Sequence, residues 1–348
     1  MSPQVRMIND IAVQFRHQAL DTAAAAIAEH IRAFWDPRMR AELIRRADAE
    51  PETLDPLALA AVLLLTQPQG DHVPAHHLRY AVNCSILFTD LPLLERPAAA
   101  RAAGFDAVEF WWPFADAVPP DTHVQAFVDA VHDAGVQLVG LNFFAGDMPG
   151  GDRGVLSSPA HSAEFRDNVE LVATIGAATG CRNFNALYGN RIPYLTRERQ
   201  DDTAVANLAF AAGVMARIGG TVLVEPVSGP FPYLLRTAAD VLAVLDRIRD
   251  ERGARNLALL ADLYHLTVNG DDVAKVLADH ADRIGHVQIA DAPGRHEPGT
   301  GDIDVGGHLS RLEQAGYRGW VVLEYVATRP GFDWLPRHRR AATKGTPA

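Results

Sequence analysis

The second part of the chain alternates between short apolar runs and longer amphipathic stretches. The runs, which we expect to be β-strands, cover residues 80–84, 107–111, 137–142, 183–187, 221–225, 257–262, 286–290 and 321–325. Apolar residues at helical spacing fill the intervals, for example at 160–178, 203–218 and 237–249. Eight β–α alternations within about 270 residues are typical of a closed (β/α)8 barrel, the TIM barrel. An open doubly wound sheet is the alternative, and the lack of Gly-x-Gly-x-x-Gly after the first strand disfavours it.

The first part of the chain shows helical periodicity throughout and no strand signal. Apolar positions recur three or four residues apart, as at Val5, Ile8 and Ala12. Asp36-Pro37 and Asp55-Pro56 each have the form of a helix N-cap followed by proline at the first helical position. Residues 68–78 are rich in Pro, Gly, Asp and His, which favours a linker with exposed histidines. We therefore expect an all-helical domain at 1–67, a linker at 68–78 and the barrel at 79–348.

Composition excludes several classes of protein. The formal net charge is −11 and no basic stripe is visible, which argues against a nucleic-acid partner. The apolar runs are far shorter than the ~20 residues that span a bilayer, and the N-terminus has no signal-peptide core. Cys84 and Cys181 lie far apart in apolar segments, as expected of reduced, buried thiols. We expect a soluble cytoplasmic enzyme with no membrane partner, and a homo-oligomer is compatible with this composition.

Four consecutive expected strands each end near an oxygen-bearing side chain. These are Glu225, Asp262, Gln288 and Glu324. In a (β/α)8 barrel the carboxyl ends of all strands meet at one mouth, where active sites lie. Burying three carboxylates together is costly unless a cation compensates for their charge. Oxygen ligands of this kind favour a divalent metal, Mg²⁺ or Mn²⁺. The alternative is that each carboxylate caps a helix or pairs with an arginine.

Further polar residues are placed to contact a substrate. His265 follows Asp262 by three residues and can turn back toward the mouth. Arg295 and Glu297 lie in the Gly- and Pro-rich loop after the seventh expected strand, and an arginine there suits a substrate carboxylate. Glu109 ends the second expected strand and is as easily explained by a structural role. No Gly-x-Ser-x-Gly elbow is present, so a serine hydrolase is not supported.

The barrel sequence resembles the hydroxypyruvate isomerase family of xylose isomerase-like (β/α)8 barrels. The matching text covers residues 79–335 and includes Asn-Cys-Ser-Ile-Leu-Phe at 83–88, Ala-Gly-Asp-Met-Pro-Gly-Gly-Asp-Arg-Gly at 145–154, Asp-Leu-Tyr-His at 262–265 and His-Val-Gln-Ile-Ala-Asp-Ala-Pro-Gly-Arg-His-Glu-Pro-Gly-Thr-Gly at 286–301. The resemblance implies that Glu225 and Glu324 act as proton donor and acceptor near the metal, and that Asp262 and Gln288 complete the metal shell. The implied reaction interconverts hydroxypyruvate and tartronate semialdehyde.

The sequence departs from that family directly after Glu225. The family has a longer polar loop at this point, whereas this chain reads Val-Ser-Gly-Pro-Phe-Pro-Tyr at 227–233. Because the change falls at the mouth, it bears on the substrate more than on the reaction. A 2-oxotetronate isomerase acting on a four-carbon acid is therefore an alternative, and a sugar epimerase is a weaker one. A metal endonuclease would need more histidine ligands and a basic face.

The N-terminal segment resembles the delta subunit of formate dehydrogenase. The match covers residues 4–65 and is most distinctive in Phe-Trp-Asp-Pro-Arg-Met-Arg at 34–40. The resemblance implies that residues 1–67 contact formate dehydrogenase subunits. An ordinary helical turn with an arginine-rich face is an equally good explanation of the same residues. If the helical part is the working one, the whole chain is an accessory or binding module rather than an enzyme.

Overall fold

A computed structural model describes residues 3–18, 20–66 and 76–340 of the chain. The chain divides into two compact units, Met1–His72 and Val73–Ala348. Most of the expected linker at 68–78 lies outside the described residues. None of the helices in the described part of the chain has the length and apolar character needed to cross a membrane.

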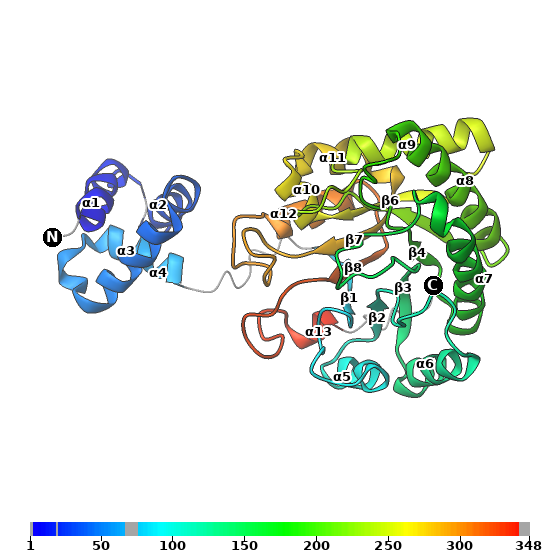
Figure 1. The fold of residues 1–348 in the computed structure, drawn as a ribbon. Coiled ribbons are helices and arrows are strands. Elements are labelled where there is room, and N and C mark those ends of the chain that lie inside the picture. The colour runs from blue at the N-terminus through cyan, green and yellow to red at the C-terminus, as the bar shows by residue number, and fades with distance from the viewer. Residues whose placement is uncertain (1–2, 19, 67–75, 341–348) are drawn as a thin grey trace. The chain divides into compact units, whose positions relative to one another are not determined.

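In its described residues the first unit contains helices and no strand (Figure 1). They are α1 (Pro3–Phe15), α2 (Leu20–Phe34), α3 (Pro37–Ala49), the short 3₁₀ turn η1 (Pro51–Thr53) and α4 (Pro56–Thr66). The expected caps are present: a carboxylate oxygen of Asp36 accepts a hydrogen bond from the backbone N of Arg38 at 2.7 Å, and one of Asp55 accepts from that of Leu57 at 2.9 Å. Ile8, Ile27 and other apolar residues of the four helices form one buried cluster.

The second unit is a closed barrel of eight parallel strands, which confirms the expected (β/α)8 fold. The strands are β1 (Arg79–Asn83), β2 (Ala107–Phe110), β3 (Gln137–Asn142), β4 (Asn183–Asn185), β5 (Thr221–Val224), β6 (Leu257–Asp262), β7 (Ile284–Ile289) and β8 (Trp320–Leu323). They follow one another around the barrel in chain order, and β8 closes onto β1. Each expected strand therefore exists, and its ends differ from the expected ones by at most two residues.

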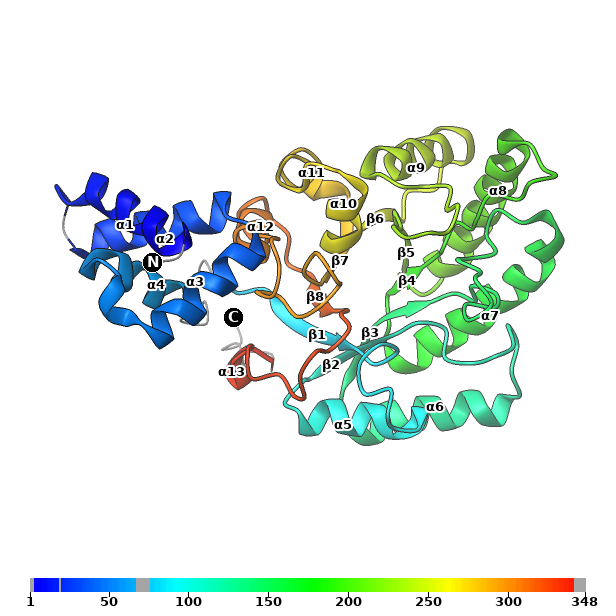
Figure 2. The same ribbon diagram turned by 60° about the vertical axis from the view of Figure 1, so that its left-hand side comes forward.

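Helices surround the barrel (Figures 1 and 2). They are α5 (Arg96–Ala102), α6 (Asp121–Ala134), α7 (Ser162–Thr179), α8 (Arg197–Ala216), α9 (Ala238–Arg252), α10 (Leu263–Asn269), α11 (Val273–His280), α12 (Val305–Gln314) and α13 (Arg337–Arg340), with 3₁₀ turns η2 (Leu93–Glu95), η3 (Pro159–His161) and η4 (Ala281–Arg283). A left-handed glycine ends several of them, such as Gly180 after α7. The core lies between these helices and the strands.

The residues just before β1 differ from the expectation of exposed linker histidines. His77 is exposed, but His76 is only 2% exposed, and its ring lies 3.1 Å from the hydroxyl of Tyr80. Burial is the main cause that lowers the pKa of His76, to about 4. His72 lies outside the described residues. The two cysteines are buried and unpaired, as expected.

Candidate active site

Four polar side chains at the ends of neighbouring strands lie at one mouth of the barrel. Glu225 directly follows β5, Asp262 ends β6, Gln288 lies near the end of β7, and Glu324 directly follows β8. Asp262 pairs with Gln288 across β6 and β7, so these two lie at the same level. None of the four is more than 5% exposed. The structure thus gathers the residues expected to bind a metal in one buried region.

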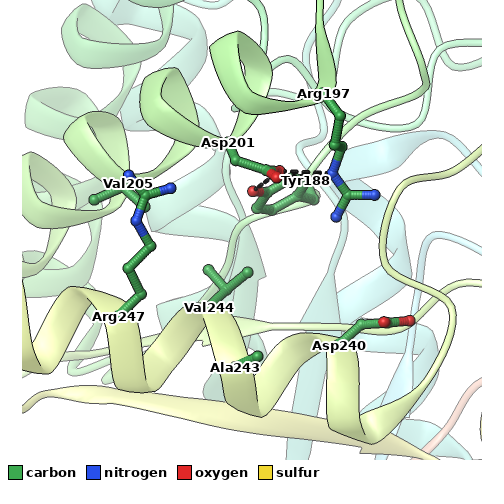
Figure 3. A pocket seen from close by; sticks show the side chains of 8 residues that line it. All are labelled: Tyr188, Arg197, Asp201, Val205, Asp240, Ala243, Val244 and Arg247. Carbon is green, nitrogen blue, oxygen red and sulfur yellow. Dashed lines mark hydrogen bonds and ion pairs between the residues drawn. The ribbon is translucent and has the colours of Figure 1, made fainter.

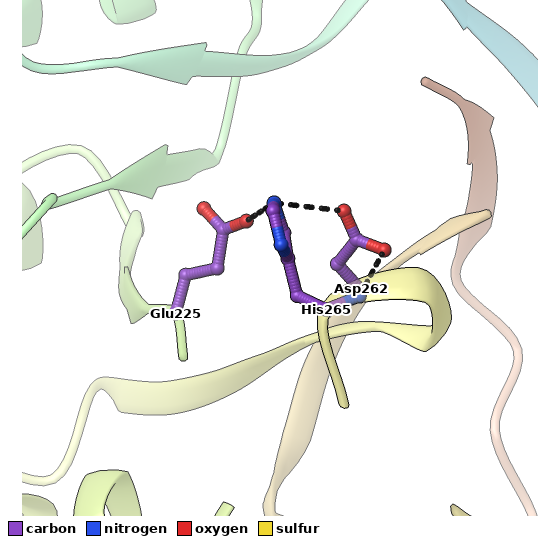
Figure 4. A group of neighbouring side chains, drawn as sticks. All are labelled: Glu225, Asp262 and His265. Carbon is purple, nitrogen blue, oxygen red and sulfur yellow. Dashed lines mark hydrogen bonds and ion pairs between the residues drawn. The ribbon is translucent and has the colours of Figure 1, made fainter. Parts of the chain in front are cut away.

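Glu225, Asp262 and His265 form the most compact part of this region (Figure 4). Nε2 of His265 lies 3.8 Å from Oε1 of Glu225 and 3.6 Å from Oδ2 of Asp262. One nitrogen or oxygen atom from each of the three lies within 4.8 Å of the others. Asp262 is also the N-cap of α10, because its Oδ1 accepts hydrogen bonds from the backbone of Tyr264 and His265.

His265 is oriented by Ser228, in the loop after β5. Nδ1 of His265 lies 3.0 Å from the backbone N and 2.7 Å from the hydroxyl of Ser228. A backbone N–H can only donate, so Nδ1 accepts, and Nε2 carries the proton of the neutral ring. Burial lowers the pKa of His265 to about 4, which keeps the ring neutral near pH 7. The face turned toward Glu225 and Asp262 is therefore an N–H donor rather than a metal ligand.

Arg295 lies between two of the carboxylates. Its Nη2 donates to Oε1 of Glu324 and, at 3.3 Å, to Oδ2 of Asp262. In this structure the guanidinium that was expected to hold a substrate carboxylate is held inside the acidic cluster. Its Nε is buried and has no hydrogen-bond partner among the described residues.

Glu297 lies outside this group, although the sequence suggested a substrate contact. Its buried carboxylate accepts hydrogen bonds from the backbone N of Thr328 at 2.9 Å, from the hydroxyl of Thr328 at 2.8 Å and from the backbone N of Arg329 at 3.3 Å. These bonds tie the loop after β7 to the loop after β8. We therefore leave Glu297 out of the proposed substrate site.

The two glutamates have strongly perturbed acidities. Burial, followed by the negative charges of Glu324 and Asp262, raises the pKa of Glu225 well above its usual range. Burial also raises the pKa of Glu324 to about 8, although Arg295 opposes this shift. Raised pKa values let a carboxyl group both release and accept protons near neutral pH, as general acid–base catalysis requires.

The residues at the mouth fit a divalent cation. Gln288 donates through Nε2 to Oε2 of Glu324 at 2.5 Å, and its Oε1 is buried with no hydrogen-bond partner among the described residues. An orphaned amide oxygen beside three carboxyl groups is a set of hard donors. A cation here would favour the ionised forms of Glu225 and Glu324, whose pKa values burial raises.

Several contacts that shape the site could not be predicted from the sequence. Nδ2 of Asn185, at the end of β4, donates to Oε2 of Glu225 at 2.7 Å. The guanidinium of Arg153, in the loop after β3, stacks on the ring of Phe231, with 3.9 Å from Cζ to the ring centre. Arg153 lies in the segment 145–154 that carried the family resemblance, and Phe231 lies in the shortened loop after Glu225. Both positions were therefore visible as motifs, but the contact between them was not.

A shallow hollow on the outside of the barrel lies away from this chemistry (Figure 3). It is lined by residues of α8 and α9 together with Tyr188. The hydroxyl of Tyr188 donates to Oδ1 of Asp201 at 2.7 Å, and Arg197 pairs with the same carboxylate at 2.8 Å. These groups satisfy one another, so the hollow offers no reactive constellation.

Comparison with known proteins agrees with this geometry. Residues 97–344 match the family described as Xylose isomerase-like TIM barrel. A protein of Streptomyces coelicolor named "Putative hydroxypyruvate isomerase" is 49% identical over 275 residues, 76% of this chain and 98% of that protein. Hydroxypyruvate isomerase of Escherichia coli is 32% identical, over 75% of this chain and 100% of its own length. The 2-oxo-tetronate isomerase of Cupriavidus necator is 34% identical, over 74% of this chain and 97% of its own length.

A solved structure shares the barrel, and a second family matches the helical unit. The crystal structure described as AP endonuclease, family 2, from Brucella melitensis superposes with a TM-score of 0.67 at 32% identity, over 74% of this chain and 98% of that one. Residues 4–62 match the family described as NADH-dependent formate dehydrogenase delta subunit FdsD. The chain therefore belongs to the hydroxypyruvate isomerase family of xylose isomerase-like TIM barrels, and it is an isomerase that carries a delta-subunit-like helical segment at its N-terminus.

Proposed function

We propose that the barrel interconverts hydroxypyruvate and tartronate semialdehyde, with Glu225 and Glu324 as the two proton-transferring groups. The observation that carries this proposal is the pair of buried glutamates at the ends of β5 and β8, each with a raised pKa. Isomerisation of a hydroxy-oxo acid needs one group to remove a proton from C3 and another to deliver a proton to C2. The intermediate between the two steps is a planar cis-enediolate.

Glu225, Asp262, Gln288 and Glu324 would hold a divalent metal, for which Mg²⁺ or Mn²⁺ suits the oxygen donors best. Such an ion, when bound, supplies positive charge that stabilises the oxygen anion of the enediolate. Asn185 fixes the orientation of Glu225 through its hydrogen bond to Oε2, which leaves Oε1 turned toward His265.

The remaining polar groups would bind and orient the acid. The Nε2–H of His265 is placed to donate to a substrate oxygen in the space between Glu225 and Asp262. Arg153 is a second positive charge at the mouth, half-buried on Phe231. Burial, and with it the charge of Arg295, lowers the pKa of Arg153, which is consistent with two guanidinium groups facing the same region. We assign the substrate carboxylate to Arg153, because Arg295 is already held by Asp262 and Glu324.

The direct test is turnover of hydroxypyruvate by the variants Glu225→Gln and Glu324→Gln. Each should remain folded and lose nearly all activity, because an amide cannot exchange the required proton. Full activity in either variant would remove that residue from the proposed mechanism.

A four-carbon substrate is the second candidate for the same site. It is favoured by the match to a 2-oxo-tetronate isomerase and by the altered loop at 227–233, where Phe231 contacts Arg153. Comparing kcat/KM for the three- and four-carbon acids decides between them. We take hydroxypyruvate as the first candidate because the relative at 49% identity carries that activity in its name.

The helical unit is proposed to associate with formate dehydrogenase, on the strength of its family match over residues 4–62. Removal of residues 1–70 should leave isomerase turnover unchanged and abolish co-purification with the dehydrogenase. A pull-down with the full chain that recovers no dehydrogenase subunit would contradict the association. A cytoplasmic location is in keeping with the two unpaired cysteines.

A further inference from the structure

A buried carboxylate–imidazole pair lies one step deeper in the barrel than Glu324 and Gln288. Oε2 of Glu109, on β2, lies 2.6 Å from Nε2 of His286, on β7. His286 precedes Gln288 by two residues on the same strand, so both side chains point into the barrel. Glu109 is 2% exposed and His286 is fully buried. Neither residue has a part in the proton transfers proposed above.

Two side-chain amides connect Glu109 to Glu324. Nδ2 of Asn83 lies 3.0 Å from Oε1 of Glu109 and 2.8 Å from Oε2 of Glu324. Nε2 of Gln288 lies 2.6 Å and 2.5 Å from the same two oxygens. An amide nitrogen donates and a carboxylate oxygen accepts, so the two acceptors decide which end of each amide faces them.

The orientation of Gln288 has a direct consequence for the mouth of the barrel. Because both hydrogens of Nε2 are used by Glu109 and Glu324, Oε1 must point elsewhere. It is buried and has no hydrogen-bond partner within the described part of the chain, which is costly for an amide oxygen. We infer that Glu109, anchored by His286, is a positioning residue that turns the Gln288 amide so that its oxygen faces the metal.

This inference rests on the metal site proposed above, and the neighbouring strand supports it independently. Gly140 on β3 pairs with Glu109 on β2. A Cβ atom added at Gly140 would lie 2.2 Å from Oε2 of Glu109. Glycine weakens the interior of a strand, and one common reason for it is that another group approaches closely. At this point the group is the Glu109 carboxylate.

The test is titration of the full-length, metal-free protein with Mn²⁺ by isothermal calorimetry. In Glu109→Gln one amide oxygen replaces two carboxylate oxygens, so it cannot accept both from His286 and from the amides of Asn83 and Gln288. With the new nitrogen toward Gln288, turning Gln288 over relieves the conflict but removes its oxygen from the metal. Mn²⁺ affinity should fall about 10- to 100-fold, as is usual when the partner of a metal ligand is changed. If Glu109 acts through Gln288, the double variant Glu109→Gln/Gln288→Ala should bind Mn²⁺ nearly as well as Gln288→Ala alone, with an affinity lower by less than about threefold.

Two further variants separate orientation from general damage to the fold. Gly140→Ala leaves both side chains of the pair, Glu109 and His286, unchanged but displaces the Glu109 carboxylate, so it should also weaken Mn²⁺ binding. It serves as the test if Glu109→Gln does not fold. Asp201→Asn makes the same acid-to-amide change on the outside of the barrel (Figure 3) and should leave Mn²⁺ affinity unchanged. Thermal unfolding of each variant checks the fold.

The outcomes are distinct. Wild-type affinity in folded Glu109→Gln or Gly140→Ala, or a fully additive loss in the double variant with Gln288→Ala, would overturn the role of Glu109. A wild-type chain that binds no Mn²⁺ would overturn the metal site itself, and this inference with it, while leaving the two-glutamate chemistry to be judged by turnover.

Discussion

The raised pKa of Glu324 predicts a variant that gains stability while it loses activity. The carboxyl group has a pKa of about 8 in the folded protein, against 4.5 for an ordinary glutamate. Between these two pKa values the carboxyl group of Glu324 is ionised in the unfolded chain but protonated in the folded chain. The native state then binds more protons, so the free energy of unfolding falls as the pH rises through this window. In Glu324→Gln a neutral amide replaces the carboxyl group, and this penalty disappears.

The size of the effect follows from the same two values. At pH 7 the solution is about 2.5 pH units above the pKa of 4.5 that the glutamate has in the unfolded chain, while Glu324 in the folded protein is still protonated. Ionisation of the unfolded chain therefore lowers the free energy of unfolding by about 3 kcal/mol. Near pH 4, where both states are protonated, this contribution vanishes, and the remaining difference in stability reports the contacts of the new amide with Arg295, Asn83 and Gln288. For a domain of this size about 3 kcal/mol is roughly 6–12 °C in the melting temperature.

Circular dichroism melts of metal-free protein at pH 4, 7 and 8.5 measure this difference on the transition of the barrel. Glu324→Gln should melt higher than wild type at pH 7 and 8.5, by a margin that grows with pH, and should show almost no turnover. A difference in melting temperature that does not shift in favour of the variant between pH 4 and pH 8.5 would refute the burial argument. Added Mn²⁺ should narrow the gap, because it favours the ionised carboxylate of the wild type.

Three other changes test separate parts of the structure. Arg153→Met should raise KM for hydroxypyruvate at least tenfold with a smaller effect on kcat, because it removes a charge that binds the acid and not one that moves a proton; an unchanged KM would remove Arg153 from the substrate site. Asp36→Ala should lower the stability of the helical unit by about 1 kcal/mol, seen in the melt of that unit, because α3 loses its N-cap; no shift would show that the cap contributes nothing. Gly154→Ala should prevent correct folding or sharply reduce the yield of folded protein, since its φ is +105° and a Cβ there would lie 2.0 Å from the carbonyl oxygen of Leu187; a normal melt would contradict this.

The barrel was predictable because its signal is repeated eight times. Each strand is a short apolar run followed by a helix, and the polar residues at four strand ends stand out against it. Because the carboxyl ends of all strands of such a barrel meet at one mouth, the sequence alone predicts that Glu225, Asp262, Gln288 and Glu324 share one region. Strand ends were less certain, by one or two residues, because the last hydrogen bonds of a strand depend on its neighbours.

The contacts made across the barrel were not predictable in this way. Arg295 lies in a loop whose conformation includes a left-handed backbone at Arg295 itself, and no local rule indicates that it turns inward to Asp262 and Glu324. Glu109 and His286 are 177 residues apart, so nothing in either segment shows that they pair. His76 was expected in a flexible linker, and its burial depends on Tyr80 in the first strand. Each of these contacts depends on tertiary packing, which single-segment patterns do not contain.

The position of Arg295 also bears on the order in which this enzyme is assembled. A guanidinium keeps its charge at every physiological pH and is part of the chain, so Asp262 and Glu324 are never left without a counterion. A newly synthesised chain can therefore close its barrel before any metal arrives. An ion that binds at this point would have to compete with Arg295 for these two carboxylates.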